Sequence, residues 1–210
     1  MSVNFKKQSM SKKTALEIAK EVGITLKNLK TFAGHDAGLG INADICLNGK
    51  AFAHAYDDAY GGMMDIDALG SVDKVGDTYE ASKELKRNRE IIKEVEAAIA
   101  KYPEHEVVFG GRPHMVKEDL EGLVNALVDE METQKRIKRD QKKGILIKTV
   151  MGYRTLAWKA GTIDGMLKKY PGDLNKKKIL DMVQKGYDEC KAKGDEVLNL
   201  EYLKSIGINI

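Results

Sequence analysis

The segment from residue 41 to residue 56 constrains the fold more than any other part of the chain, because it has the pattern of a β-hairpin. Apolar and polar residues alternate up to Leu47, the dipeptide Asn48-Gly49 follows, and the alternation returns from Lys50. Asn-Gly is the favoured sequence for a two-residue type I′ turn. Cross-strand partners in such a hairpin share one face of the sheet. The pattern therefore predicts a core face made of Ile41, Ala43, Ile45, Leu47, Phe52, His54 and Tyr56, with Asn42, Asp44, Cys46, Ala51, Ala53 and Ala55 on the opposite face.

A short helix and a strand are predicted before this hairpin. Thr14 and Glu17 have the spacing of a capping box, and Gly23 is a natural end for the helix that they begin. Residues 24–32 alternate, which predicts a half-buried strand. The face of this strand toward the core is predicted to consist of Ile24, Leu26 and Phe32. The same segment also fits a helix-turn-helix with residues 26–32 as the recognition helix, an alternative that predicts DNA binding.

The middle of the chain predicts two long helices. Asp77 and Glu80 have the spacing of a capping pair, and apolar residues then recur at helical intervals up to Tyr102. A Gly-Gly-Arg-Pro turn at 110–113 separates this helix from a second one, which is expected at about 114–142. The apolar stripe of the second helix fades toward its end, where the sequence becomes basic.

The remaining residues predict a small mixed part. It consists of strands at 145–150 and 153–158, a threonine-capped helix at 162–169, a helix capped by Asp173 and closed by Gly194, and a last turn capped by Asn199. The order of elements predicts an α+β fold with a small N-terminal antiparallel β-hairpin sheet, then long helices and a small mixed C-terminal part. The expected division is 1–72, 73–143 and 144–210, with a domain seam near 68–78.

Charge is sorted along the chain. Between residues 36 and 80, nine acidic residues stand against two lysines, and between residues 135 and 178, fourteen basic residues stand against three aspartates. The net charge of +3 hides this separation. A lopsided charge steers charged partners toward one part of a protein, and it also allows two halves of one molecule to attract each other. The candidate partner-binding face is the acidic set Asp36, Asp57, Asp58, Asp65 and Asp67.

The same acidic region is the densest set of potential metal ligands. A metal-dependent nuclease or hydrolase would use His35, Asp36 and Asp57, because Mg²⁺ and Mn²⁺ sites are built from carboxylates and, in some proteins, a histidine. Two features favour a solvated acidic loop instead. His54 is predicted on the core face, and the adjacent Asp57 and Asp58 point to opposite sides of an extended chain. We therefore assign no metal ligand and expect no cofactor.

The strongest basic cluster lies at 135–143. It predicts a nucleic-acid interface, because Lys and Arg neutralise phosphates. The alternative is a solvated helix end, where cations also complement the helix dipole. Trp158, the only tryptophan, is expected in the core rather than on a base-stacking surface. The candidate nucleic-acid-binding residues are Lys135, Arg136, Lys138, Arg139, Lys142 and Lys143.

Other function classes receive no support from the sequence. Neither a Ser-His-Asp nor a Cys-His arrangement can be argued, and Cys46 and Cys190 have no CxxC partner, which is typical of a reduced, intracellular protein. No apolar run approaches the about 20 residues that cross a bilayer. The N-terminus is polar and basic and lacks the apolar stretch of a secretion signal. These features predict a cytoplasmic protein.

Two parts of the chain resemble small uncharacterised proteins of bacteriophages and mobile elements. Residues 24–30, 42–50 and 57–62 are similar to their opening strand, hairpin and Gly-Gly exit, and residues 158–163 with 197–207 are similar to their ending. About 20 residues at the N-terminus depart from the pattern. The resemblance implies a non-enzymatic accessory protein in the cytoplasm of a bacterial host. Its partner would be a host protein or protein–nucleic-acid complex, such as a nuclease or a CRISPR effector that it inhibits. The shared motifs are structural, so the resemblance implies no functional residue.

Overall fold

Two compact units make up the computed structural model of this chain, which describes residues 13–33, 39–109, 111–149 and 152–210. The first unit is Met1–Asp129 and the second is Glu130–Ile210. The boundary lies within helix α3 (Leu120–Asp140), and the seam predicted near 68–78 falls inside the first unit. Each unit has a hydrophobic core of its own. Within the described residues, none of the helices is both long enough and apolar enough to span a bilayer.

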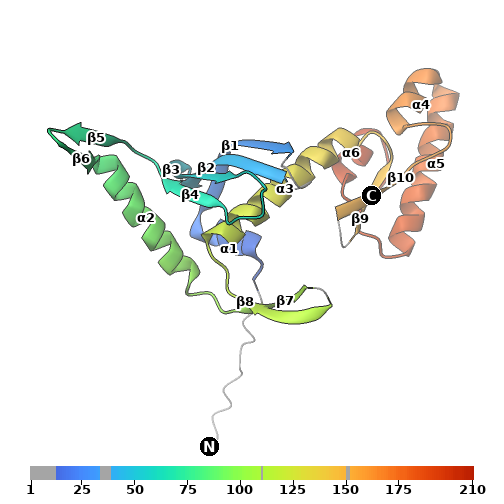
Figure 1. Ribbon diagram of the computed structural model, residues 1–210. Helices are drawn as coiled ribbons and strands as arrows, with labels where there is room; N and C mark the ends of the chain where they lie inside the picture. Colours follow the sequence, from blue (N-terminus) through green and yellow to red (C-terminus); the bar gives the residue numbers. More distant parts are fainter. Residues whose placement is uncertain (1–12, 34–38, 110, 150–151) are drawn as a thin grey trace, which may run out of the picture. The chain divides into compact units, whose positions relative to one another are not determined.

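The first unit is built on a four-stranded antiparallel sheet, which confirms the predicted α+β class. Its strands follow each other in space in chain order: β1 (Ile24–Ala33), β2 (Leu39–Leu47), β3 (Lys50–Asp57) and β4 (Asp65–Ala68). Figure 1 shows this sheet together with the helices of the unit. Asn48 and Gly49 have φ values of 50° and 81°, as the predicted type I′ turn requires. The turn therefore sets the β2–β3 pairing at Leu47 and Lys50.

A β-bulge at Phe52 corrects the predicted faces of β3. Cys46 pairs with Ala51 and Ile45 pairs with Ala53, so Phe52 is an extra residue in its strand. From this point the alternation is reversed. Ala53 and Ala55 are buried in the core, and His54 and Tyr56 lie on the outer face of the sheet. The prediction that His54 and Tyr56 face the core was therefore wrong.

A second irregularity lies in β1 and corrects the position of Phe32. The pairing with β2 shifts between Lys27 and Lys30, and Asn28 takes a left-handed conformation with φ of 54°. Because of this shift Phe32 lies on the outer face, where its ring stacks on Tyr56 with centroids 6.3 Å apart. Residues 24–33 form a strand, which confirms the predicted strand and makes the alternative, a helix-turn-helix in the N-terminal part, wrong.

Helix α1 (Ala15–Val22) confirms the predicted capping box. The Glu17 backbone N–H donates to the Thr14 hydroxyl, and the Thr14 N–H donates to the Glu17 carboxylate. Gly23 ends the helix with φ of 84°. Helices α1, α2 (Lys83–Ile99) and the first half of α3 supply buried side chains to the core on the inner face of the sheet. These include Ile18, Val95, Ile99, Leu123 and Val124.

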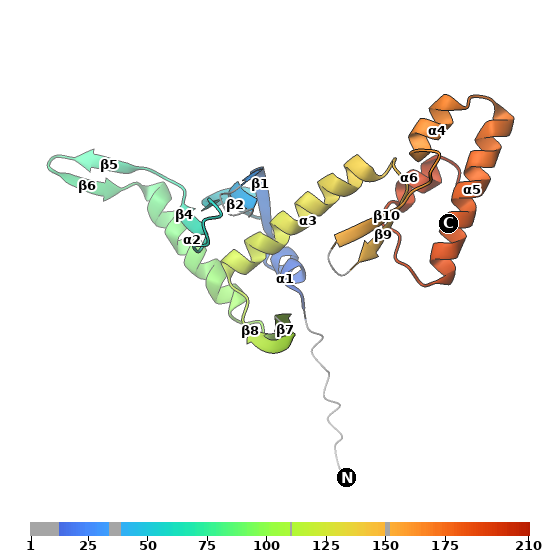
Figure 2. The same cartoon turned by 45° about the vertical axis from the view of Figure 1, so that its right-hand side comes forward.

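The segment before α2 forms a β-hairpin rather than the predicted start of a helix. Strands β5 (Val72–Val75) and β6 (Thr78–Ala81) pair around Gly76 and Asp77. Gly76 has φ of 61°, which suits the first position of a type II′ turn. Helix α2 begins only after Ser82, whose hydroxyl accepts from the Leu85 N–H at 3.1 Å. In Figure 2 this hairpin extends from the start of α2.

A further hairpin replaces the predicted beginning of the second long helix. Strands β7 (His105–Phe109) and β8 (Arg112–Val116) pair along their full lengths, and α3 starts at Leu120 instead of near residue 114. The Asp119 carboxylate accepts from the Gly122 N–H at 2.8 Å. This bond satisfies one of the free donors at the helix start.

The second unit follows the predicted order of elements. It contains the hairpin of β9 (Ile145–Thr149) and β10 (Gly152–Leu156), then α4 (Ile163–Lys169), α5 (Asp173–Ala192) and α6 (Leu200–Ser205). Thr162 caps α4 as expected, with its hydroxyl accepting from the Gly165 N–H. The predicted Asp173 cap was wrong, because Gly172 is the N-cap of α5 and makes no side-chain capping bond.

Asn199 performs a different task from the predicted helix cap. Its buried side chain donates to the carbonyls of Gln141 and Gly144, both at 2.9 Å, and accepts from the Leu146 N–H at 3.0 Å. It makes no side-chain capping bond to α6. The amide therefore ties the start of α6 to the loop between α3 and β9.

Candidate nucleic-acid interface

The two units carry charge of opposite sign. Residues 1–129 contain 17 Lys and Arg against 21 Asp and Glu, a balance of −4. Residues 130–210 contain 18 against 11, a balance of +7. The sorting seen along the sequence is therefore also a sorting by folded unit. The second unit is the one suited to a polyanionic partner.

Asp140 organises the basic end of α3. Its buried carboxylate accepts from Nε and Nη2 of Arg139, both at 3.0 Å, and from the Tyr153 hydroxyl at 2.6 Å. Nζ of Lys143 lies 2.7 Å from the same carboxylate. The hydrogen bonds from Arg139, then those from Lys143 and Tyr153, hold the pKa of Asp140 well below its usual range. The carboxylate thus stays ionised and fixes two cations and one phenol in place.

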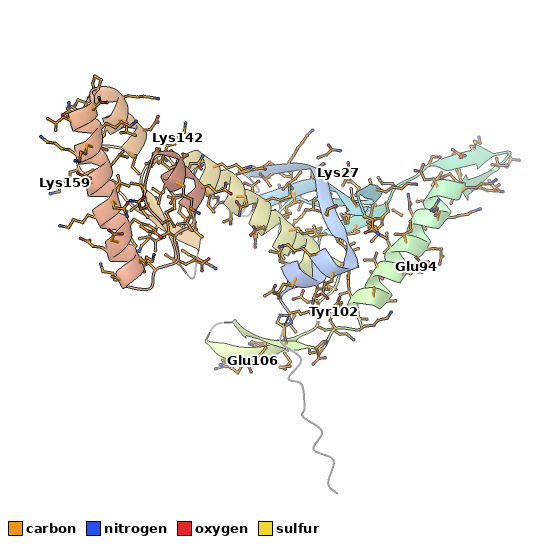
Figure 3. The ribbon with its side chains drawn as sticks, turned by 180° about the vertical axis from the view of Figure 1, so that it is seen from behind. Lys27, Glu94, Tyr102, Glu106, Lys142 and Lys159 are labelled. Carbon is orange, nitrogen blue, oxygen red and sulfur yellow. The ribbon has the colours of Figure 1, made fainter. Side chains whose placement is uncertain are left out.

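The other predicted cations differ in how they are held. Lys135 pairs with Glu132 at 2.7 Å. Arg136, Lys138 and Lys142 are exposed, and none of them forms an ion pair with another residue of the described part of the chain. In Figure 3, Lys142 lies beside the C-terminal end of α3. Of the predicted cations, these three are therefore the ones available to bind an external anion.

A shallow polar hollow lies beside this cluster. Its volume is about 570 Å³, and its lining comes from the last turns of α3 and from β10: Thr133, Arg136, Arg139, Asp140, Gly152, Tyr153 and Thr155. Two guanidinium groups and two threonine hydroxyls border it, so it offers donors to a phosphate or sugar. The pKa of the Tyr153 phenol is raised by burial and then by its bond to Asp140, which keeps this ring neutral.

Trp158 contributes to the core of the second unit, as expected. Its side chain is partly buried and packs against the second hydrophobic cluster. Gly186 on α5 makes room for it, since a Cβ there would lie 3.2 Å from the indole. The tryptophan is therefore a packing residue rather than an open stacking surface.

The described aspartates of the candidate acidic face differ in what they contact. Asp57 and Asp58 accept from the backbone N–H groups of Ala59 and Tyr60, so both carboxylates stabilise the loop after β3. Asp65 and Asp67 lie exposed on β4, opposite Tyr56 and His54. Asp36 and His35 lie outside the described residues. Of the described members of the acidic set, Asp65 and Asp67 are therefore the two whose carboxylates are exposed on a strand, while Asp57 and Asp58 bond to their own loop.

The displaced His54 pairs with Asp44 on the outer face of the sheet. Its Nδ1 lies 3.0 Å from the Asp44 carboxylate, which also accepts from the Asn28 amide at 2.6 Å. The bond from Asn28 and then the one from His54 lower the pKa of Asp44. Among the described residues, no group of three or more His, Cys, Asp or Glu is placed to hold a metal ion. The pair is a cross-strand contact created by the bulge at Phe52.

Sequence reasoning missed a second histidine contact. Nε2 of His105 lies 3.3 Å from the carboxylate of Glu118, and both side chains are largely buried. Burial raises the pKa of Glu118, against the opposing effect of His105. The dipeptide Gly110-Gly111 between two short strand-like runs is the signal that would have placed His105 on a hairpin.

The two cysteines are structural. Cys46 and Cys190 are free and buried, and burial raises the pKa of each thiol. A thiol with a raised pKa carries little of the thiolate that acts as a nucleophile.

Comparison of the chain with protein-family models, with curated proteins and with solved structures finds no match.

Proposed function

We propose that this chain acts by binding, and that the basic end of α3 in its second unit contacts the phosphate backbone of nucleic acid. The observation that carries the proposal is the arrangement around Asp140. One buried carboxylate fixes Arg139 and Lys143, while Arg136, Lys138 and Lys142 face solvent beside it. Because Asp140 holds Arg139 and Lys143 in place, these two cations lose less conformational entropy than free side chains do when a phosphate binds.

Two further features support this proposal over a solvated helix end. The second unit has a balance of +7, so long-range attraction of a polyanion adds to the local contacts. The hollow beside α3 adds Thr133 and Thr155 to the two arginines. Threonine hydroxyls and arginine forks are common donors to phosphate oxygens, and such contacts carry no sequence information. We therefore expect salt-sensitive binding through the backbone at this surface.

Reversing two of the exposed cations tests the proposal. The double variant Arg136→Glu, Lys138→Glu is expected to weaken binding to a fluorescently labelled DNA at least tenfold, because two phosphate contacts become repulsions. Fluorescence anisotropy at about 50 mM salt measures the affinity. The matched control is Arg87→Glu, Arg89→Glu, which makes the same charge change at the same spacing on exposed residues of α2. Equal losses in the two double variants would contradict binding at this surface.

The accessory role implied by the resemblance to phage proteins is our second proposal. The exposed pair Asp65 and Asp67 favours it, because these carboxylates lie on strand β4 beside the exposed Tyr56. An aromatic ring flanked by acidic groups suits a basic surface on a partner protein. We rank it second because Asp57 and Asp58 already serve the local loop. For the third alternative, metal-dependent hydrolysis, the described residues offer no set of converging ligands.

A further inference from the structure

Helices α4 and α5 are packed together and joined by a turn of three residues. The turn is Tyr170-Pro171-Gly172, and Gly172 has φ of 105°. Ile163 and Met166 from α4 share a core with Val183 from α5. A turn of three or four residues that contains glycine, between two packed helices, is the connection found in a helix-turn-helix. In this arrangement the second helix, here α5, is the one that enters the DNA major groove.

The surface around this turn is basic and exposed to solvent. All residues of the segment 168–178, here named the tip segment, are exposed. The tip segment contains five lysines and one aspartate. It also exposes Tyr170 by 42% and Leu174 by 69%. Lysines suit phosphates, and an exposed leucine suits a thymine methyl group.

The charge along α5 singles out its first turns. Beyond Lys178 the exposed side of the helix has mixed charge, with Asp181, Asp188 and Glu189 alongside Lys185 and Lys191. These carboxylates would be repelled by DNA phosphates, while Lys176 and Lys177 would be attracted. A duplex is therefore attracted most strongly to the beginning of α5, and it is with its N-terminal residues that a recognition helix contacts the bases.

The tip segment and the basic end of α3 belong to the same unit and lie at opposite ends of α4. The Asp164 N–H at the start of α4 lies 3.3 Å from the Lys142 carbonyl, which joins α4 to the loop after α3. Seven residues of helix span about 10 Å. In Figures 1 and 2 the turn between α4 and α5 lies at the end of the second unit away from the β9–β10 hairpin. One duplex can thus meet both basic surfaces.

We propose that α4 and α5 form a helix-turn-helix that docks on duplex DNA with the tip segment toward the major groove. This inference rests on the proposed function, in which the second unit binds nucleic acid. It adds that the partner is duplex DNA and that the contact is made in the major groove. Backbone binding by the end of α3 applies to single and double strands alike. Groove docking by the tip segment requires a duplex.

The test compares two double variants of the full chain on two probes. The tip variant is Lys176→Glu, Lys177→Glu, and its matched control is Lys191→Glu, Lys193→Glu at the far end of the same unit, where both lysines are also exposed. The probes are a labelled duplex of about 20 base pairs and the labelled single strand of the same sequence. Anisotropy titrations give the four affinities, and Trp158 fluorescence verifies that each variant is folded.

Relative to the control, the tip variant is expected to lose at least tenfold in duplex affinity and less than about threefold in single-strand affinity. Equal duplex affinities of tip variant and control would overturn the helix-turn-helix. If the tip variant loses the same factor in affinity for the duplex and for the single strand, docking of the tip segment in the groove is overturned. In both cases the proposed function stands if the Arg136 and Lys138 variant still weakens binding. A wild-type chain that binds neither probe would overturn both proposals.

Discussion

Replacing Asn199 with alanine is expected to lower the free energy of unfolding of the second unit by about 3 kcal/mol. The substitution removes the partner of three backbone groups at once, namely the carbonyls of Gln141 and Gly144 and the N–H of Leu146. Leu146 is fully buried, and Asn199 itself is only 3% exposed. Water cannot readily replace the lost bonds at such a site, so part of the desolvation cost remains.

Trp158 makes this effect measurable in one unit alone. It is the only tryptophan of the chain and packs in the second core, so its fluorescence in a urea titration reports the unfolding of that unit. The control is Asn209→Ala, because exposed Asn209 bonds to Gln184 through its backbone N–H and carbonyl rather than its side chain. We expect the control to change the midpoint little. A wild-type midpoint for Asn199→Ala would mean that the tie between α6 and the loop after α3 contributes little stability.

Leu123→Ala is expected to destabilise the first unit by about 3 kcal/mol while leaving the Trp158 transition in place. Leu123 is fully buried on the first half of α3, in the core formed with the sheet and with α1 and α2. Removing its side chain leaves a cavity that the sheet cannot close completely. Because the two cores are separate, the loss belongs to the first unit.

Far-UV circular dichroism and Trp158 fluorescence, recorded in the same denaturation, separate the two units. The dichroism signal should begin to fall at a lower denaturant concentration for Leu123→Ala, because α1, α2, the first half of α3 and the four-stranded sheet belong to the first unit and unfold with it. Leu39→Ala is the control, since Leu39 is 40% exposed in the same unit. If the fluorescence midpoint falls as far as the dichroism midpoint, the two units unfold together. The two cores would then not be independent in stability.

Features set by neighbouring residues could be predicted from the sequence. The turn at Asn48-Gly49 and the capping box of Thr14 and Glu17 depend on a few adjacent residues, and both are present as expected. The threonine cap of α4 and the β9–β10 pair were found for the same reason. Local chemistry decides these elements, so no tertiary information was needed.

The bulge at Phe52 could not be predicted, because the sequence is ambiguous where it occurs. Alanine stands at 51, 53 and 55, and a residue this small fits either face of a sheet. The strict alternation through Phe52 therefore looked sound, although the pairing slips by one residue there. A slip of one residue moves every later side chain to the other face. This accounts for the misplacement of His54 and Tyr56.

The hairpins β5–β6 and β7–β8 were missed for a different reason. Capping-pair spacing at Asp77 and Glu80 favoured a helix, although Gly76-Asp77 is also a sequence for a two-residue turn. Helix α2 uses Ser82 as its N-cap, so residues 76 and 77 are free to form the turn of the hairpin. Two-residue turn dipeptides carried more information here than acidic residues at capping spacing.

The basic cluster of the candidate site was visible in the sequence, but its organisation was not. Asp140 is the only acidic residue among positions 135–143, and that isolation was the available signal. Its bond to Tyr153 joins residues that are 13 positions apart, which only the packing of β10 against α3 reveals. The sequence therefore named the cations without showing which are held and which are free to bind.

The salt dependence of duplex DNA binding by the wild-type chain tests the central claim most directly. Anisotropy titrations between about 50 and 200 mM salt give the association constant as a function of salt concentration. With about four to five phosphates neutralised by the second unit, the logarithm of the association constant should fall against the logarithm of the salt concentration with a slope of about −4. A slope near zero, or no binding at the lowest salt concentration, would contradict a surface built to hold the phosphate backbone.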